Sequence, residues 1–154
     1  MSSVRSLAWF RQLATLLDAR FRIPGTNIRF GLDPILSLLP GIGDLASPAF
    51  AVALLVQALY QGVPRLVMVR MLLNALIDAL LGAVPFAGPV ADIFYRANLR
   101  NLALLERHAT PGVAPTRGDR IFVLVAAGLF GVVILVPVVL AVWLTFLVWN
   151  AIAP

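Results

Sequence analysis

Charged and polar residues divide the chain into three predominantly apolar blocks, at 30–61, 65–84 and 121–149. The third block is an uncharged run of 29 residues, from Ile121 to Trp149. A helix needs only about 20 apolar residues to cross the hydrocarbon core of a bilayer. The sequence therefore predicts one transmembrane helix within residues 121–150.

The segment before the first block has the periodicity of an amphipathic helix. Between residues 4 and 21, apolar side chains recur at helical spacing, at Leu7, Phe10, Leu13, Leu17 and Phe21. Such a helix either packs on its own protein or lies in the lipid headgroup layer. We favour the second arrangement because Trp9 and Phe10 are residue types common in that layer. A polar, turn-rich link completes this N-terminal segment, residues 1–29.

Proline and glycine interrupt the first block, which opens a membrane-embedded region at 30–108. Asp33 is followed by proline, a pattern typical of a helix start, so a short helix is expected to about Leu39. A second helix is expected from about Asp44 to Tyr60, and a turn follows it. No single straight helix can span this block.

The second block is interrupted in the same way. A helix is expected from Arg65 to Val84, followed by a proline- and glycine-rich break. A third helix is expected from Pro89 to about Glu106, and it should end in water because it is too polar to cross lipid. The clearest linker in the chain, residues 109–120, precedes the transmembrane helix.

The two blocks share a spacing of acid, proline and glycine. In each, an aspartate is followed seven residues later by proline and ten residues later by glycine, and the copies lie 45 positions apart. We therefore predict an internal duplication, with units at 30–64 and 65–108. The residues that break the helices of the two units are Pro40, Gly41, Gly43, Pro85, Gly88 and Pro89.

Composition identifies a bilayer as the expected solvent. The chain is 61% hydrophobic and 12% charged, whereas soluble domains have about 25% charged residues. The net charge of +5 comes without a run of basic residues or an interleaving of basic and aromatic residues, which argues against nucleic acid and favours anionic lipid. The arginines expected to contact lipid headgroups are Arg5, Arg11, Arg20 and Arg22.

The sequence lacks the residues that several kinds of chemistry require. With no cysteine and one histidine, we expect no disulfide, no metal site and no cofactor. The chain has no glycine-rich phosphate loop with a lysine and no nucleophile elbow, so we expect no enzyme. The N-terminal segment lacks the clean apolar stretch of a cleaved signal peptide, and none is expected.

Arginine placement predicts the orientation in the membrane. Arginines gather before the first block and between the second and third blocks, and both groups belong in the cytoplasm. The N-terminus is then cytoplasmic and the C-terminus lies outside. The first two blocks return the chain to the side it left, either as two full crossings with residues 62–65 outside or as two re-entrant hairpins.

Polar side chains in the apolar blocks are the candidate site. Arg70, Asn74 and Asp78 follow one another at steps of four, so they share one helix face that must avoid lipid. Asp78 is either a member of a structural network or part of a transport site. Asp33 and Asp44 are either helix caps or ligands of a cation, proton or headgroup, as in transporters with broken helices.

The chain resembles a family catalogued as domain of unknown function 4112, over about residues 20–108. The stretches that carry this resemblance are Phe21-Arg-Ile-Pro-Gly-Thr, Arg29-Phe-Gly-Leu-Asp-Pro, Leu39-Pro-Gly-Ile-Gly-Asp44, Arg70-Met-Leu-Leu-Asn74, Asp78-Ala-Leu-Leu-Gly-Ala-Val-Pro85 and Asn98-Leu-Arg-Asn101-Leu-Ala-Leu-Leu-Glu. The family pattern places Gly-Asp after the second break, where this chain has Gly88-Pro89. The resemblance implies a small bacterial membrane protein, and it implies no particular activity.

The sequence thus predicts an all-helical, multi-pass protein of the bacterial inner membrane. The expected function is that of a small transporter, channel or lipid-translocating module for an ion or polar solute, with acids in broken helices. The alternative is a non-transporting scaffold or lipid-binding module in which the acids only cap and pair. Because short spans enclose little interior, we also expect a homo-oligomer.

Overall fold

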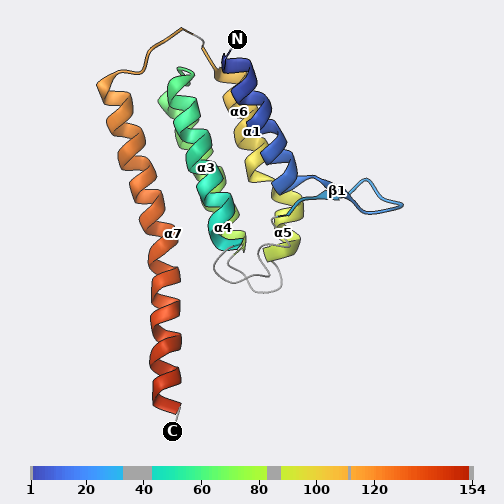
Figure 1. The fold of residues 1–154 in the computed structure, drawn as a ribbon, viewed down its shortest axis with the longest axis vertical. Helices are drawn as coiled ribbons and strands as arrows, with labels where there is room; N and C mark the ends of the chain where they lie inside the picture. The colour runs from blue at the N-terminus through green and yellow to red at the C-terminus, as the bar shows by residue number, and fades with distance from the viewer. Residues whose placement is uncertain (1, 33–42, 83–87, 111, 153–154) are drawn as a thin grey trace.

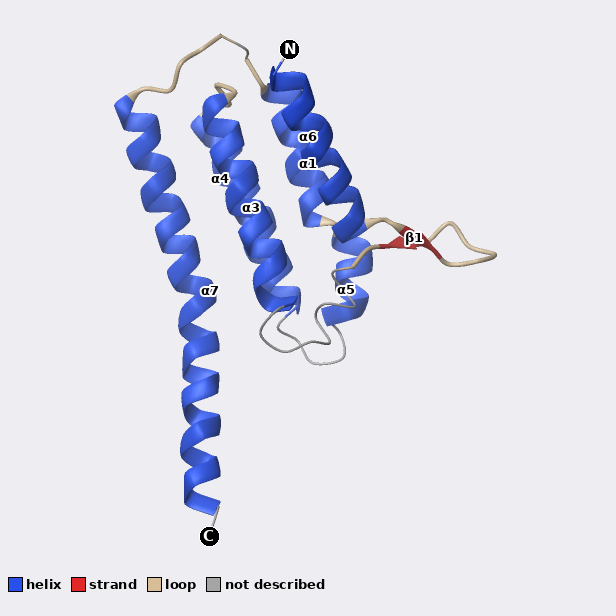
Figure 2. Ribbon diagram, viewed as in Figure 1, coloured by secondary structure: helices blue, strands red, loops and turns tan. Residues whose placement is uncertain are grey.

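The protein is mostly helical, as the sequence predicts. The computed structural model describes residues 2–32, 43–82, 88–110 and 112–152. Its elements are α1 (Ser2–Asp18), β1 (Phe21–Arg22), β2 (Arg29–Phe30), α3 (Gly43–Tyr60), α4 (Arg65–Gly82), α5 (Gly88–Tyr95), α6 (Ala97–His108) and α7 (Arg117–Ile152). Figure 2 shows a feature that the sequence did not predict, a short antiparallel hairpin of β1 and β2 that projects from the side of the molecule.

Helices α1, α3, α4 and α6 pack side by side into a bundle (Figure 1). Each contributes the apolar side chains that its periodicity places on one face, and burial of this apolar surface is the main force that holds the helices together. The fully buried members of the core include Ala14, Leu54, Leu55, Met68, Met71 and Leu105.

Helix α1 belongs to this bundle. Its apolar face packs along α6, and the Phe10 ring lies 5.8 Å from the Phe50 ring of α3, measured between centroids. We favoured placing this apolar face in the lipid headgroup layer. That prediction is wrong, because the face packs against apolar side chains of α3 and α6. The helix ends at Asp18 rather than near residue 21, since the chain turns there into β1.

The prediction of one continuous helix from Pro89 to about Glu106 is also wrong, because the chain breaks at Arg96 into α5 and α6. Arg96 adopts a left-handed conformation (φ 42°, ψ 57°), which costs a non-glycine residue about 1–2 kcal/mol. The Arg96 guanidinium donates hydrogen bonds to the carbonyl oxygens of Ile93 and Arg29, at 3.3 and 2.9 Å. These contacts with α5 and β2 offset the local cost, and helical periodicity does not reveal them.

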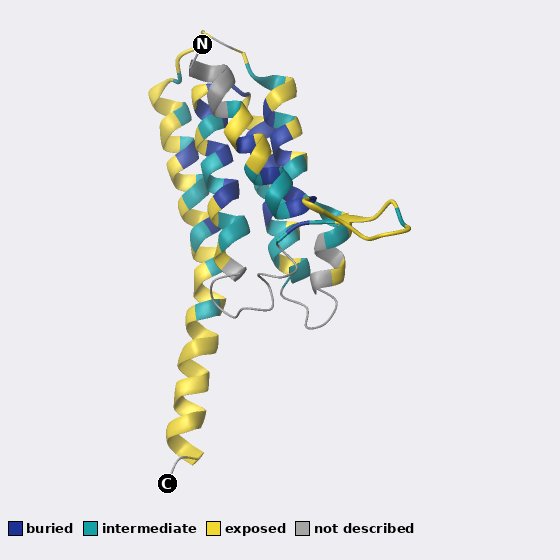
Figure 3. Ribbon diagram, turned by 45° about the vertical axis from the view of Figure 1, so that its right-hand side comes forward, coloured by how far each residue is buried: buried dark blue, intermediate teal, exposed yellow. Residues whose placement is uncertain are grey.

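Helix α7 packs against the bundle in its first half and extends beyond it in its second half. Val123 and Phe130, in its first half, are buried against α3 and α4, whereas residues 141–152 are all exposed (Figure 3). Within the described residues, α7 is the one helix that is both long and apolar enough to cross a membrane. The predicted C-terminal apolar helix is therefore present, and it begins at Arg117.

The α3–α4 turn and the linker before α7 lie at the same end of the bundle. The Thr110 amide donates to the carbonyl oxygen of Gln61 at 2.7 Å, and Arg65 forms an ion pair with Asp119 at 2.7 Å. Two full crossings would place the turn on the membrane side opposite the linker, whereas these contacts hold the turn and the linker together.

The two segments that break the apolar blocks are only partly described. Helices α3 and α5 begin at Gly43 and Gly88, the two glycines that the 45-residue spacing relates, but α3 has 18 residues and α5 has eight. The described residues do not include the predicted Asp33, Pro40, Gly41 and Pro85, nor the side chains of Arg5, Asp44 and Pro89. The duplication therefore stays a prediction.

Candidate functional site

A chain of hydrogen-bonded polar side chains joins four helices inside the bundle. Asn98 of α6 donates from Nδ2 to Asp18 Oδ1 of α1 at 2.8 Å and to Ser47 Oγ of α3 at 2.7 Å. Ser47 Oγ in turn donates to Asp78 Oδ2 of α4 at 3.1 Å. Asp18 and Asn98 are buried, with 3% and 1% of their surface exposed, and Asp78 is half-buried.

Asp18 also occupies the N-terminus of α6. The residue before that helix, Arg96, makes no side-chain cap, and the Leu99 amide instead donates to Asp18 Oδ2 at 2.8 Å. The first amides of a helix lack partners within it, and a carboxylate at this end is stabilised by the helix dipole. The last residue of α1 thus caps α6 across the bundle.

A second group of hydrogen-bonded polar side chains lies one turn further along α6. Asn74 donates from Nδ2 to Asn101 Oδ1 at 2.9 Å and accepts from the Tyr95 hydroxyl at 3.1 Å. Asn101, which is fully buried, donates to the Met71 carbonyl oxygen at 3.0 Å. Both ends of the Asn74 amide are therefore held in place.

The members of the predicted stripe on α4 have partners on other elements. Asp78 accepts from Ser47 of α3, Asn74 bonds to Asn101 and Tyr95, and Arg70 is exposed. The sequence did not predict the contact between Asp78 and α3.

The arginines predicted to contact lipid headgroups have varied surroundings. Arg11 forms an exposed ion pair with Glu106 of α6, at 2.6 Å. Arg22 donates to the Thr26 carbonyl oxygen and to Asn27 Oδ1 within the hairpin. Arg20 is exposed to solvent.

Sequence reasoning missed most of the network. It did not include Asp18, Asn98 or Asn101 among the candidate site residues. Their spacing of three residues, shared with the buried Leu102 and Leu105, was the available signal, because it places two amides on the apolar face of α6. In the described part of the chain no three His, Asp or Glu side chains gather as metal ligands.

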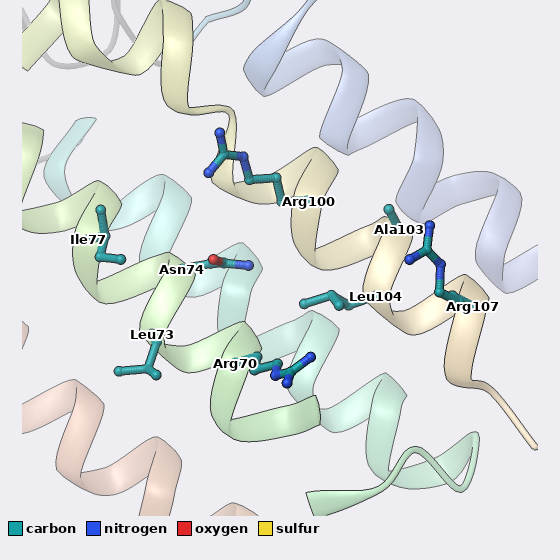
Figure 4. Close-up of a pocket in the computed structure, with 8 residues that line it drawn as sticks. All are labelled: Arg70, Leu73, Asn74, Ile77, Arg100, Ala103, Leu104 and Arg107. Atoms are coloured by element: carbon teal, nitrogen blue, oxygen red, sulfur yellow. The ribbon is translucent and has the colours of Figure 1, made fainter. Parts of the chain in front are cut away.

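A shallow pocket of about 520 Å³ lies between α4 and α6 (Figure 4). Arg70 and Asn74 line it from α4, and Arg100 and Arg107 line it from α6; its apolar walls are Leu73, Ile77, Ala103 and Leu104. None of the described residues that line this pocket carries a carboxylate. The second polar group lies at its edge, because Tyr95 bonds to Asn74 and lies under the guanidinium of Arg100.

A separate polar contact fixes the start of α7, ahead of its uncharged run. Hydrogen bonds from the Thr116 hydroxyl and amide, together with Arg65, lower the pKa of Asp119 from 3.8 to about 2. Asp119 is therefore ionised at neutral pH, and its ion pair links α4 to α7 at the end where the linker lies.

Comparison with known proteins gives one match. Residues 6–109 match the family model described as Domain of unknown function (DUF4112). The chain belongs to this family. The DUF4112 domain comprises α1 to α6, with both polar groups and the arginine-lined pocket, whereas α7 follows it. No curated protein and no solved structure matches the chain.

Proposed function

We propose that this DUF4112 protein is a bacterial inner-membrane protein that binds anionic lipid from the cytoplasmic side and transports no solute. The observation that carries the proposal is the boundary between an apolar and a basic surface along α4. The apolar surface consists of exposed α4 side chains spaced by three or four residues, Leu66, Val69, Leu73, Ile77 and Leu80. The arginine-lined pocket lies beside it.

Helix α7 sets the depth of the molecule in this proposal. Its residues 132–152 would be about 31 Å long as a helix, which equals the thickness of the hydrocarbon core of about 30 Å. The bundle then lies at the cytoplasmic surface, with the turn at 61–64 and the linker in water. The start of α3 and the end of α4 then point toward the bilayer, as in the predicted re-entrant arrangement, while α7 crosses it.

The polar groups inside the bundle support a structural role over a transport path. Every described buried side-chain nitrogen or oxygen has a hydrogen-bond partner within the chain. Asp18, Asn98 and Ser47 each bond to another helix, so together they fix the relative positions of helices. A solute would have to break these bonds in order to pass, at a cost of about 1–3 kcal/mol for each buried group left unpaired.

One observation favours the second candidate, a transporter or lipid-translocating module. The hydrogen-bonded side chains run from the half-buried Asp78 to the buried Asp18, and such a chain is suited to moving a proton. The predicted path of this candidate also includes Asp33 and Asp44.

Substitution of Asp78 by asparagine separates the two candidates. Asparagine keeps an oxygen that can accept from Ser47, so we expect Asp78→Asn to preserve folding and lipid binding. Proton, potassium and lipid movement should be measured in liposomes that contain the full chain. We expect no flux above that of empty liposomes for either protein. Flux that the wild type supports and Asp78→Asn abolishes would establish the transporter instead.

Self-association remains part of the proposal. Exposed apolar side chains cover the end of α7, and they can face lipid or a second copy of the chain. We propose a homo-oligomer, and a monomeric mass in nanodiscs would rule it out.

A further inference from the structure

We propose that the pocket between α4 and α6 binds the phosphate group of an amphiphile. This inference rests on the proposed function and names the ligand of that surface. The pocket has three arginines, apolar walls and a volume of about 520 Å³, and binding sites for small molecules commonly have volumes of about 300–1,000 Å³. A phosphate group alone would fill a small part of this space.

The charge of the pocket is not neutralised by the described part of the chain. Arg70, Arg100 and Arg107 form no ion pair with any described carboxylate. Glu106, which precedes Arg107 in the sequence, pairs with Arg11, and Asp78, eight residues after Arg70, accepts a hydrogen bond from Ser47. Arginine binds phosphate through two parallel N–H donors, so three guanidinium groups around one space favour a phosphate over a singly hydrogen-bonded anion.

One of the three arginines is held in position before any ligand binds. The Arg100 guanidinium lies 4.2 Å from the centre of the Tyr95 ring, and such stacking contributes about 0.5–1 kcal/mol at an exposed site. The Tyr95 hydroxyl donates to Asn74, which is itself held by the buried Asn101. Figure 4 shows Asn74 and Arg100 on either side of the space between the two helices. Fixing a side chain in advance reduces the entropy lost on binding.

The apolar side of the pocket matches the other half of an amphiphile. Leu73 and Ile77 are exposed on α4, and Leu80 continues the same surface toward the end of that helix. In the proposed orientation this end points into the bilayer, while Arg70 lies closer to the cytoplasmic end. A phosphate at the arginines would therefore have its acyl chains directed along Leu73 and Ile77 toward the membrane.

The phosphate could belong to a membrane lipid or to a soluble phosphate ester, and titration distinguishes the two. The full chain in phosphatidylcholine nanodiscs is titrated calorimetrically with dihexanoyl phosphatidic acid and with glycerol 3-phosphate. We expect the lipid to bind at least about tenfold more tightly, because only the lipid also contacts the apolar wall. Leu73→Asn should weaken binding of the lipid and leave glycerol 3-phosphate unchanged.

Substitution of the arginines tests the site itself. Arg70→Gln and Arg100→Gln should each weaken lipid binding about tenfold, because each removes charged hydrogen bonds to the phosphate. Arg117→Gln removes the same charge from an exposed position outside the pocket and should change binding less than twofold. All of these side chains are exposed, so the melting temperature serves as the check that each variant folds.

The outcomes separate this inference from the proposed function. If the lipid binds but the pocket variants behave like Arg117→Gln, the pocket assignment is wrong and lipid binding stands. If glycerol 3-phosphate binds as tightly as the lipid and depends on the same arginines, the phosphate site stands and the lipid-binding function fails. If neither ligand binds, both are wrong.

Discussion

Asp18→Ala is expected to lower the free energy of unfolding by about 3 kcal/mol, which corresponds to a fall in melting temperature of about 9 °C for a chain of this size. The carboxylate accepts from Asn98 and from the Leu99 amide at 2.8 Å each, and only 3% of the residue is exposed. Alanine would leave a buried amide and the N-terminus of α6 without this partner. Thermal unfolding in a mild detergent, followed by circular dichroism, measures the change.

A double-mutant cycle attributes this loss to the contact with α6. Asp18→Ala and Asn98→Ala should together cost less than the sum of the two single substitutions, because both remove the same hydrogen bond. Gln12→Ala, at an exposed position on the same helix, is the control and should change stability by less than about 0.5 kcal/mol. Additive effects of the two core substitutions would mean that the network does not join α1 to α6.

Gly31→Ala is expected to destabilise the protein by about 3 kcal/mol, through steric overlap instead of a lost bond. A Cβ atom at Gly31 would overlap the backbone carbonyl of Leu17 at the end of α1. Backbone cannot move aside as a flexible side chain can. The chain after β2 would have to leave α1, which would break the hydrogen bond of 3.0 Å from the Leu32 amide to the Leu16 carbonyl oxygen.

Gly128→Ala is the matched control for this substitution. Nothing lies within 4 Å of a Cβ atom at Gly128, and alanine is favoured over glycine inside a helix by about 1 kcal/mol. Chemical denaturation should therefore show opposite changes in stability for the two variants. An unchanged midpoint for Gly31→Ala would mean that the hairpin does not pack against α1 at this position.

Periodicity and composition predicted the helices whose pattern can be recognised within one segment of the sequence. Helix α7 follows from an uncharged run of 29 residues, and α4 begins at the predicted Arg65. The turn after Tyr60 also follows from its glycine and proline. These features depend on local chemistry, so neighbouring residues are enough to indicate them.

Features that depend on contacts between distant segments could not be predicted in this way. The break at Arg96 depends on Arg29, 67 residues away, and the cap of α6 depends on Asp18, 81 residues from the amide that it accepts. Nothing near either position in the sequence indicates its partner. For the same reason the candidate site changed from a stripe of polar residues on α4 to a network centred on α6 and a pocket beside it.

In the proposed orientation, the α3–α4 turn and the linker before α7 share the cytoplasmic side, while α7 carries the C-terminus across the membrane. Because the chain has no cysteine, single-cysteine variants at exposed positions can be labelled with a maleimide that does not cross membranes. Tyr60→Cys and Val113→Cys should react only in inverted inner-membrane vesicles, and Asn150→Cys only in spheroplasts. Reaction of Tyr60→Cys in spheroplasts together with Asn150→Cys would contradict the account.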